Sequence, residues 1–481
     1  FFRHPPAMAT QRRYLGSPSL EEVNSWVAEG VDELTVQYPK EASATDLQAL
    51  NALSASSVLT TCTVVLDGCE VGPEGARVLG GLGGIPSLRI LRLYMDGNQI
   101  GPQGAQDLVE GLVQGGLTEL DLILDRNALG AAGAQWLAQL RCASTLQMLT
   151  LHMFGNDLGD QGLAHLAALQ QLPQLRRLVL TLDGNEITAA GAYPLAQFWD
   201  CPELRSLTIN LAQNEMQDAG CSHLAHLGKH QQLQELALTM DGNAITAGGA
   251  KMLSHFRTMG SLRTLTLNLG GNNVQAAGAH WLSRIRELPE LQVLSLNLDL
   301  NDIGAEGAQA LSTLKDCRNL TELTLNVHGN SIGPEGACHL SALSTAPSLT
   351  DLTLNLDGNG ITNAGVAHLV AFAEAPMLER LCLNLGMNQL GDEGATQLVQ
   401  LSTSERLTTL SLNLYANKFS DEGAQALLQF KTASAINDLT ITLKGNNLTA
   451  AGVGHLQKLM VAKPNTKILV DPVAQTFRPH P

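Results

Sequence analysis

One spacing limits what this chain can fold into more than any other feature: an asparagine returns every 29 residues. One step before the first of them stands Cys69, so the chain holds fourteen units of equal length. Units of constant length that repeat the same pattern predict a stacked repeat array rather than one compact globular core. The asparagines are Asn98, Asn127, Asn156, Asn185, Asn214, Asn243, Asn272, Asn301, Asn330, Asn359, Asn388, Asn417 and Asn446.

Other positions keep step with this asparagine. Six residues after it there is always a glycine, and ten residues after it always a leucine. Before it, a segment such as Leu352–Leu356 alternates apolar and polar residues, which predicts a strand with its leucines facing inward. We expect the asparagine to end the strand and to satisfy backbone groups of neighbouring turns with its amide. A helix is predicted next, because Pro73, Pro102 and Pro334 stand where a first helical residue would.

The stretch Leu349–Leu369, LTDLTLNLDGNGITNAGVAHL, resembles the ribonuclease-inhibitor-type leucine-rich-repeat family. The resemblance runs over about Cys62–Leu459. Two extra residues before the asparagine lengthen the strand, as in long-strand, 29-residue arrays of protists. The family implies an α/β solenoid, a curved horseshoe with a parallel β-sheet on the concave side and α-helices on the convex side. It also implies protein binding, often through the concave sheet, and no catalytic residues.

The chain is expected to divide into four parts. Helices at Ser19–Val27 and Asp46–Leu53 and a strand at Leu34–Tyr38 suggest a cap that covers the open end of the array. At the other end, Ile468 and Val470 are in register with one further strand. The predicted parts are a disordered or targeting-like segment (1–18), an N-terminal capping region (19–61), the array of fourteen units (62–460), and a C-terminal cap strand and tail (461–481).

Composition excludes several classes of function. A net charge of −16 disfavours nucleic acid, because phosphate binding needs a concentrated basic face. No stretch of 18 apolar residues and no signal-peptide core occur, so we expect no transmembrane segment. Eight dispersed cysteines without a CxxC pair fit a cytoplasmic or other intracellular reducing compartment, and targeting to an organelle by the first residues stays open. Motifs for a metal, a phosphate loop or a catalytic nucleophile are missing, so no cofactor and no enzyme activity are expected.

The first units are the best candidate for a partner site. Four residues before the repeat position, where later units carry asparagine, they carry apolar, aromatic or histidine side chains, with carboxylates beside them. Such a row predicts a contact surface for a protein, although the capping region could instead fold over it. Close carboxylates would need an arginine, a lysine or a cation to relieve their repulsion. The candidate residues are Val65, Asp67, Tyr94, Asp96, Asp121, Ile123, Asp125, His152 and Phe154.

Two further rows are expected on the concave side. An acidic stripe is predicted two residues before the repeat asparagine in every second unit, at Asp183, Asp241, Asp299 and Asp357. It could attract basic groups of a partner or merely be a solvated face. A row of asparagines four residues before the repeat position could bond across strands as a structural ladder, or form a polar wall for a peptide or sugar. Its members are Asn268, Asn297, Asn326, Asn355, Asn384 and Asn413.

Three hypotheses of function follow. The first is a non-catalytic scaffold for protein–protein interaction, or a subunit of a larger assembly, whose partner has a basic or apolar contact surface. The second is a regulator of an enzyme, either an inhibitor or a GTPase activator. The third is a receptor for a glycan or another small ligand, which would use the asparagine row.

Overall fold

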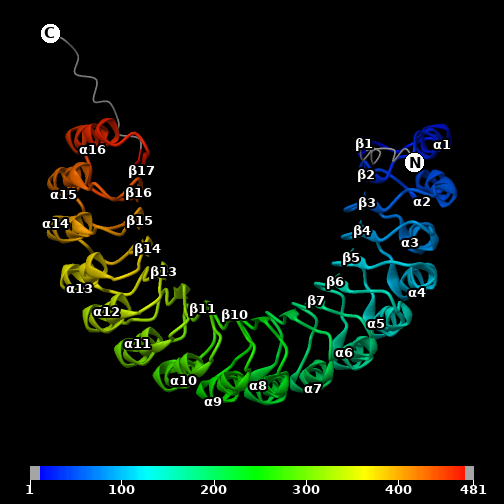
Figure 1. The fold of residues 1–481 in the computed structure, drawn as a ribbon, viewed down its shortest axis with the longest axis horizontal. Coiled ribbons are helices and arrows are strands. Elements are labelled where there is room, and N and C mark those ends of the chain that lie inside the picture. Colours follow the sequence, from blue (N-terminus) through cyan, green and yellow to red (C-terminus); the bar gives the residue numbers. More distant parts are fainter. Residues whose placement is uncertain (1–10, 472–481) are drawn as a thin grey trace, which may run out of the picture. The chain divides into compact units, whose positions relative to one another are not determined.

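The computed structural model describes residues 11–471 and divides the chain into two compact units, Phe1–Asn243 and Ala244–Pro481. Each unit is a stack of strand, turn and helix layers, with the strands on its inner side and the helices on its outer side (Figure 1). In each unit every strand pairs in parallel with the next one along the chain. The predicted parallel sheet with helices on its other side is therefore confirmed within each unit.

The first unit holds nine strands and eight α-helices among its described residues, 11–243. Its strands are β1 (Gln11–Leu15), β2 (Glu33–Gln37), β3 (Thr61–Val65), β4 (Ile90–Tyr94), β5 (Glu119–Ile123), β6 (Met148–His152), β7 (Arg177–Thr181), β8 (Ser206–Asn210) and β9 (Glu235–Thr239). Its helices are α1 (Leu20–Glu29), α2 (Ala44–Leu47), α3 (Gly72–Gly81), α4 (Gly101–Leu112), α5 (Gly130–Leu137), α6 (Gly159–Leu166), α7 (Ala189–Ala196) and α8 (Gln217–Leu224).

The second unit holds eight strands and eight α-helices within residues 244–471. Its strands are β10 (Thr264–Asn268), β11 (Val293–Asn297), β12 (Glu322–Asn326), β13 (Asp351–Asn355), β14 (Arg380–Asn384), β15 (Thr409–Asn413), β16 (Asp438–Thr442) and β17 (Thr466–Leu469). Its helices are α9 (Ala247–Leu253), α10 (Gln275–Leu282), α11 (Gly304–Ser312), α12 (Gly333–Ser341), α13 (Thr362–Leu369), α14 (Asp392–Leu398), α15 (Asp421–Leu427) and α16 (Ala450–Ala462).

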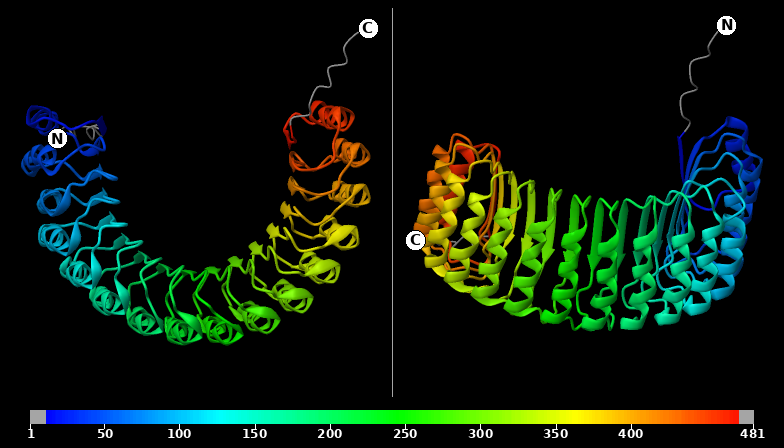
Figure 2. Two further views of the ribbon diagram at one scale, coloured as in Figure 1. Left: turned by 180° about the vertical axis from the view of Figure 1, so that it is seen from behind. Right: turned by 60° about the horizontal axis from the view of Figure 1, so that its bottom comes forward.

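The core of each unit lies between its strand layer and its helix layer, which are seen apart in the left view of Figure 2. In β13, Leu352 and Leu354 point into this layer and are at most 1% exposed, whereas Thr353 between them faces solvent. Leu369, ten residues after the repeat asparagine, closes the layer from α13 and is 0% exposed. Burying one such leucine contributes about 1.5–3 kcal/mol. Because the strands are in register at intervals of 29 residues, leucine stacks on leucine along the sheet.

The repeat asparagine lies in the turn between strand and helix and bonds to the turn before it. Asn330 is fully buried, and its Oδ1 accepts the N–H groups of Asn301 and Ile303, each at 3.1 Å. Its Nδ2 donates to the carbonyl oxygens of Leu298 at 2.8 Å and His328 at 2.9 Å. The predicted role of this amide is thus confirmed. The strand, however, ends four residues before the asparagine rather than at it, because the turn itself takes up the intervening residues.

The invariant glycine six residues later allows close packing of the helix. A Cβ atom on Gly365 would lie 2.4 Å from Ile361 Cγ2, and 3.1 Å from the Cβ of Ala337 on the neighbouring helix. The glycine-rich end of α3 has a similar explanation. There, a Cβ on Gly111 of α4 would lie 2.3 Å from the carbonyl carbon of Gly80. These glycines therefore bring two helix backbones together, and no phosphate-binding role is needed to explain them.

The capping region adds strands to the sheet. Its predicted helices and strand are present as α1, β2 and α2 with the 3-10 turn Gln48–Ala55, and β2 pairs with β3. The structure adds β1, which lies within the segment expected to be disordered or targeting-like. Tyr14 of β1 donates to Glu22 Oε1 at 2.8 Å, and its ring centroid lies 5.3 Å from that of Trp26. Residues 1–10 of that segment, and the tail after the predicted cap strand, lie outside the described residues; β17 is that strand.

Candidate functional site

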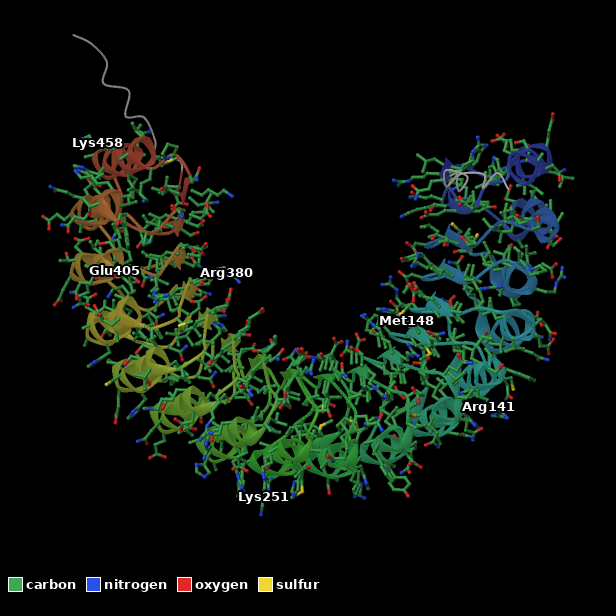
Figure 3. The ribbon with its side chains drawn as sticks, in the orientation of Figure 1. Arg141, Met148, Lys251, Arg380, Glu405 and Lys458 are labelled. Atoms are coloured by element: carbon green, nitrogen blue, oxygen red, sulfur yellow. The ribbon has the colours of Figure 1, made fainter. Side chains whose placement is uncertain are left out.

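Strand β6 presents an apolar surface on the inner side of the first unit. Its residues alternate, so that Leu149 and Leu151 are buried while Met148, Thr150 and His152 face solvent. Met148 is 39% exposed and Phe154, two residues beyond the strand, is 38% exposed. Figure 3 shows Met148 on the strand side of this unit. Met148 is not among the residues predicted from the sequence, which stand six, four and two residues before the repeat position, although the same alternation includes the eighth.

The candidate residues on the first strands lie side by side in the sheet. Val65, Tyr94, Ile123 and His152 are direct register partners on β3, β4, β5 and β6. All four side chains are half-buried, which leaves part of each side chain in contact with solvent. With Met148 and Phe154 they form a surface that we call the β6 patch.

Two arginines relieve the repulsion among the carboxylates beside the β6 patch. Arg126 Nε donates to Asp96 Oδ1 at 3.0 Å, and its Nη2 bonds to the other oxygen of the same carboxylate. Arg92 Nε donates to Asp121 Oδ2 at 3.3 Å and also pairs with Glu119. The need for a cation was predicted from the sequence, but these two arginines were not identified as its source. The sequence did contain a signal for Arg126, because it replaces a glycine that most repeats carry at this position. Arg126 has a φ of 53° there.

Asp125 lies directly under the aromatic end of the patch. Its Oδ1 accepts the backbone N–H of Phe154 at 2.7 Å. Burial raises the pKa of Asp125, and Asp96 adds to this effect, whereas the Phe154 N–H and His152 oppose it. Asp67, by contrast, is exposed at the outer end of the row. The patch therefore combines apolar side chains with carboxylates that are partly neutralised by their neighbours.

The capping region does not cover this surface within residues 11–471. The elements β2 and α2 extend the strand layer and the helix layer sideways, since β2 pairs with the edge of β3. Phe154 and Met148 stay exposed in the presence of the cap. The β6 patch is thus open to a partner as far as the described residues determine it.

The predicted acidic stripe has a packing role in both units. In the first unit, burial raises the pKa of Asp183, whose Oδ1 accepts Asn210 Nδ2 at 3.1 Å. In the second unit, Asp299 leans over Gly270, where an added Cβ would stand 2.1 Å from its Oδ1. Asp357 leans in the same way towards Gly386. A glycine next to each of these two aspartates therefore makes room for its side chain.

The asparagine row forms a ladder at one step. Asn297 Nδ2 donates to Asn268 Oδ1 at 2.8 Å, and no other bond joins two amides of the row among the described residues. Each Oδ1 of the row accepts the backbone N–H two residues ahead in the chain, as Asn355 does from Asp357 at 3.2 Å. Asn268 Oδ1 accepts both this bond and the bond from Asn297. The Nδ2 groups without a partner in residues 11–471 are those of Asn326, Asn355, Asn384 and Asn413.

Other candidates carry no visible chemistry. Within residues 11–471 no group of three His, Cys, Asp or Glu side chains is placed to hold a metal ion. Over the same residues, every helix is too short or too polar to cross a bilayer. All eight cysteines are free thiols. Burial raises the pKa of Cys62, Cys201, Cys221 and Cys317 to about 12, which makes them poor nucleophiles.

Comparison with known proteins finds leucine-rich repeats in three segments of the chain. A family model described as Leucine Rich repeat matches residues 145–167, 293–312 and 381–399. Among solved structures, 116 chains match. One is the crystal structure of an internalin (inlF) from Listeria monocytogenes, with a TM-score of 0.41 and 18% identity over 95% of this chain and 90% of that one. No curated protein matches the chain. The chain therefore contains leucine-rich repeats, and each compact unit is folded as a solenoid of strand, turn and helix layers.

Proposed function

We propose that the chain is a non-catalytic scaffold for protein–protein interaction, or a subunit of a larger assembly, which binds its partner through the β6 patch. The observation that carries this proposal is the exposure of Met148 on β6 and of Phe154 just beyond it, beside paired carboxylates. Leucine-rich-repeat folds generally serve protein binding. Each 29-residue unit pairs one strand with a helix, which also favours the ribonuclease-inhibitor-like type.

The chemistry of the patch defines the partner. An aromatic ring surrounded by half-buried apolar groups is the typical centre of a binding hot spot, and truncating such a residue costs about 2 kcal/mol or more in binding. The carboxylates at its rim favour basic groups: Asp67 is exposed, whereas Asp121 pairs with Arg92 and Asp96 pairs with Arg126. We therefore expect an apolar side chain of the partner against Phe154, with a lysine or arginine near Asp67. The free cysteines favour a reducing compartment as the site of action.

The proposal is tested with Phe154→Ala and a matched control. Tyr415→Ala alters a residue at the same repeat position in the second unit, where the tyrosine is 46% exposed. Tagged wild-type and variant proteins are used to capture partners from a native lysate, and the captured proteins are quantified by mass spectrometry. We expect Phe154→Ala to lose one captured protein by about tenfold or more, while Tyr415→Ala retains it. Equal capture by both variants and the wild type would refute binding through the β6 patch.

Regulation of an enzyme is a narrower form of the same proposal. If the captured partner is an enzyme, its turnover with and without this chain decides between an inhibitor or activator and a passive scaffold. A change in turnover that Phe154→Ala abolishes would favour regulation.

A second candidate is binding of a glycan on the strand side of the second unit. It is favoured by the free Nδ2 donors of the asparagine row together with Asp299 and Asp357, each of which has a buried Oδ1 without a partner in residues 11–471. Sugar hydroxyls both donate and accept hydrogen bonds, and Tyr415 offers a ring for stacking. A glycan array distinguishes the two: binding that Tyr415→Ala removes and Phe154→Ala preserves would favour this candidate.

A further inference from the structure

A basic segment interrupts this acidic chain on the helix side of the second unit. From residue 242 to 286 there is no Asp or Glu, although the chain has 45 acidic and 29 basic residues. The same stretch carries five basic residues, Lys251, Arg257, Arg263, Arg284 and Arg286. Like charges that gather in this way repel one another, and nothing in the repeat fold requires them.

Repeat positions place part of this charge on one surface. Lys251 and His280 stand eight residues after the repeat asparagine, on α9 and α10, and His255 and Arg284 stand twelve residues after it. Figure 3 shows Lys251 on the helix side of its unit. In the next five 29-residue repeats, the residues at these two repeat positions are uncharged in every case. These residues are Gln309, Thr313, Cys338, Ala342, Ala367, Ala371, Thr396, Gln400, Gln425 and Gln429.

Trp281 lies between the two permanent charges of this surface. Lys251 Nζ stands 5.2 Å from the centroid of its ring, and the Arg284 guanidinium carbon stands 6.0 Å from it. The ring is half-buried, so it is partly accessible from solvent. Tryptophan and arginine are enriched at the centres of protein interfaces. We call Lys251, His255, His280, Trp281 and Arg284 the α9–α10 patch.

The charge of the patch is only partly compensated. Glu287 is the first acidic residue beyond it, and it accepts bonds from both Arg284 at 2.8 Å and Arg257 at 3.1 Å. One carboxylate shared by two guanidinium groups leaves this trio with a net positive charge, and Lys251 adds to it.

We propose that the α9–α10 patch is a second docking surface, and that it binds an acidic segment of a partner protein. Charge complementarity carries this assignment. A bilayer is disfavoured, because none of the large apolar side chains exposed in residues 11–471 lies between 244 and 290. Nucleic acid is disfavoured because the charge of −16 on the whole chain repels a phosphate backbone outside the patch. The surface is independent of the β6 patch, which lies in the other unit.

The test uses a fluorescein-labelled peptide of ten glutamates as the probe, at low salt, with binding followed by fluorescence anisotropy. The test variant is Lys251→Glu/Arg284→Glu. The control, Lys431→Glu/Lys458→Glu, changes the total charge equally in the same unit, with Lys431 in the 3-10 turn after α15 and Lys458 on α16 at the repeat position of Arg284. We expect the test variant to weaken peptide binding by about tenfold or more and the control to change it by less than about twofold. Equal loss in both would mean a response to net charge alone and would overturn the proposal.

Tryptophan fluorescence supplies an independent readout. Unlabelled peptide should change the emission of the wild type, and this change should vanish in Trp281→Phe while circular dichroism shows the fold intact. The proposal is also overturned if the patch binds phosphatidylserine vesicles or a single-stranded oligonucleotide more tightly than the peptide. It fails as well if the test variant abolishes a concentration-dependent self-association in sedimentation, since the occupant would then be a second copy of this chain.

Discussion

Replacing Asn330 by alanine should break the contact between two neighbouring turns of the second unit. The side chain makes four hydrogen bonds to backbone groups, two through each of its polar atoms. The His328 carbonyl keeps a second partner, because it also accepts the Leu300 N–H at 2.9 Å. The N–H groups of Asn301 and Ile303 and the carbonyl of Leu298 have no other hydrogen bond within residues 11–471.

The magnitude follows from these three groups. Leaving one buried polar group without a partner costs about 1–3 kcal/mol. Three such groups would cost about 3–9 kcal/mol, and entry of water into the cavity brings the expected loss to about 3–5 kcal/mol. Asn384→Ala is the matched control, because its half-buried side chain accepts a single bond, from the Gly386 N–H at 3.2 Å. We expect it to cost about 1 kcal/mol.

Urea unfolding followed by circular dichroism measures the free energy of unfolding of both variants. Hydrogen exchange then locates the effect, since the amides of Asn301 and Ile303 should lose protection in Asn330→Ala and keep it in Asn384→Ala. If Asn330→Ala costs no more than the control, or if protection at those two amides is unchanged, the repeat asparagine does not stabilise the stack in the way argued.

Three further predictions concern packing and ionisation in the first unit and the cysteines. Gly111→Ala should cost about 2–3 kcal/mol in urea unfolding by forcing α4 away from Gly80, whereas Gly84→Ala, with nothing within 4 Å of its Cβ, should be nearly neutral. Titration with a thiol reagent at pH 8 should label Cys142 and Cys338 rapidly, since both are exposed, and the buried cysteines only after denaturation; rapid labelling of Cys62 would contradict its raised pKa. Burial raises the pKa of Asp125 above its ordinary value, so the ionised group opposes folding at neutral pH and the penalty disappears as the pH falls below its pKa in the unfolded chain. Asp125→Asn should therefore melt at a higher temperature than the wild type at pH 7, with the difference shrinking in acid; a lower melting temperature at pH 7 would contradict this.

The repeat elements were predictable because the same backbone and packing requirements recur in every repeat. An asparagine that bonds to a turn, a glycine that lets a helix pack closely and a leucine that fills the core each recur at a fixed interval in the sequence. The strand β1 has no such periodic signal, since QRRYL occurs once and is held by contacts of Tyr14 and Arg12 with α1. Its position depends on tertiary partners rather than on local pattern.

The candidate site was predictable in its positions but not in its interactions. Alternation along a strand predicts that Tyr94 and His152 share a face, and the register pairs confirm that they do. Whether Asp96 meets Arg126 depends on side-chain directions set by a turn with positive φ. The asparagine row shows the same limit: spacing predicts amides on adjacent strands, yet only Asn297 and Asn268 bond to each other, although all six make the same local bond to the backbone.

The backward direction of the asparagine bonds makes the two ends of the array unequal. Removing repeats from the C-terminal end takes away the asparagine amide on which the last remaining turn depends. Removing repeats from the N-terminal end leaves one asparagine amide without its partners but keeps the turns after it intact. Cys69, at the first repeat position, fits this asymmetry. Its Sγ contacts one carbonyl oxygen of the capping region, that of Pro39, at 3.2 Å. Shortened versions of this protein should therefore tolerate loss of early repeats better than loss of late ones, unless a new terminal cap replaces the missing acceptor.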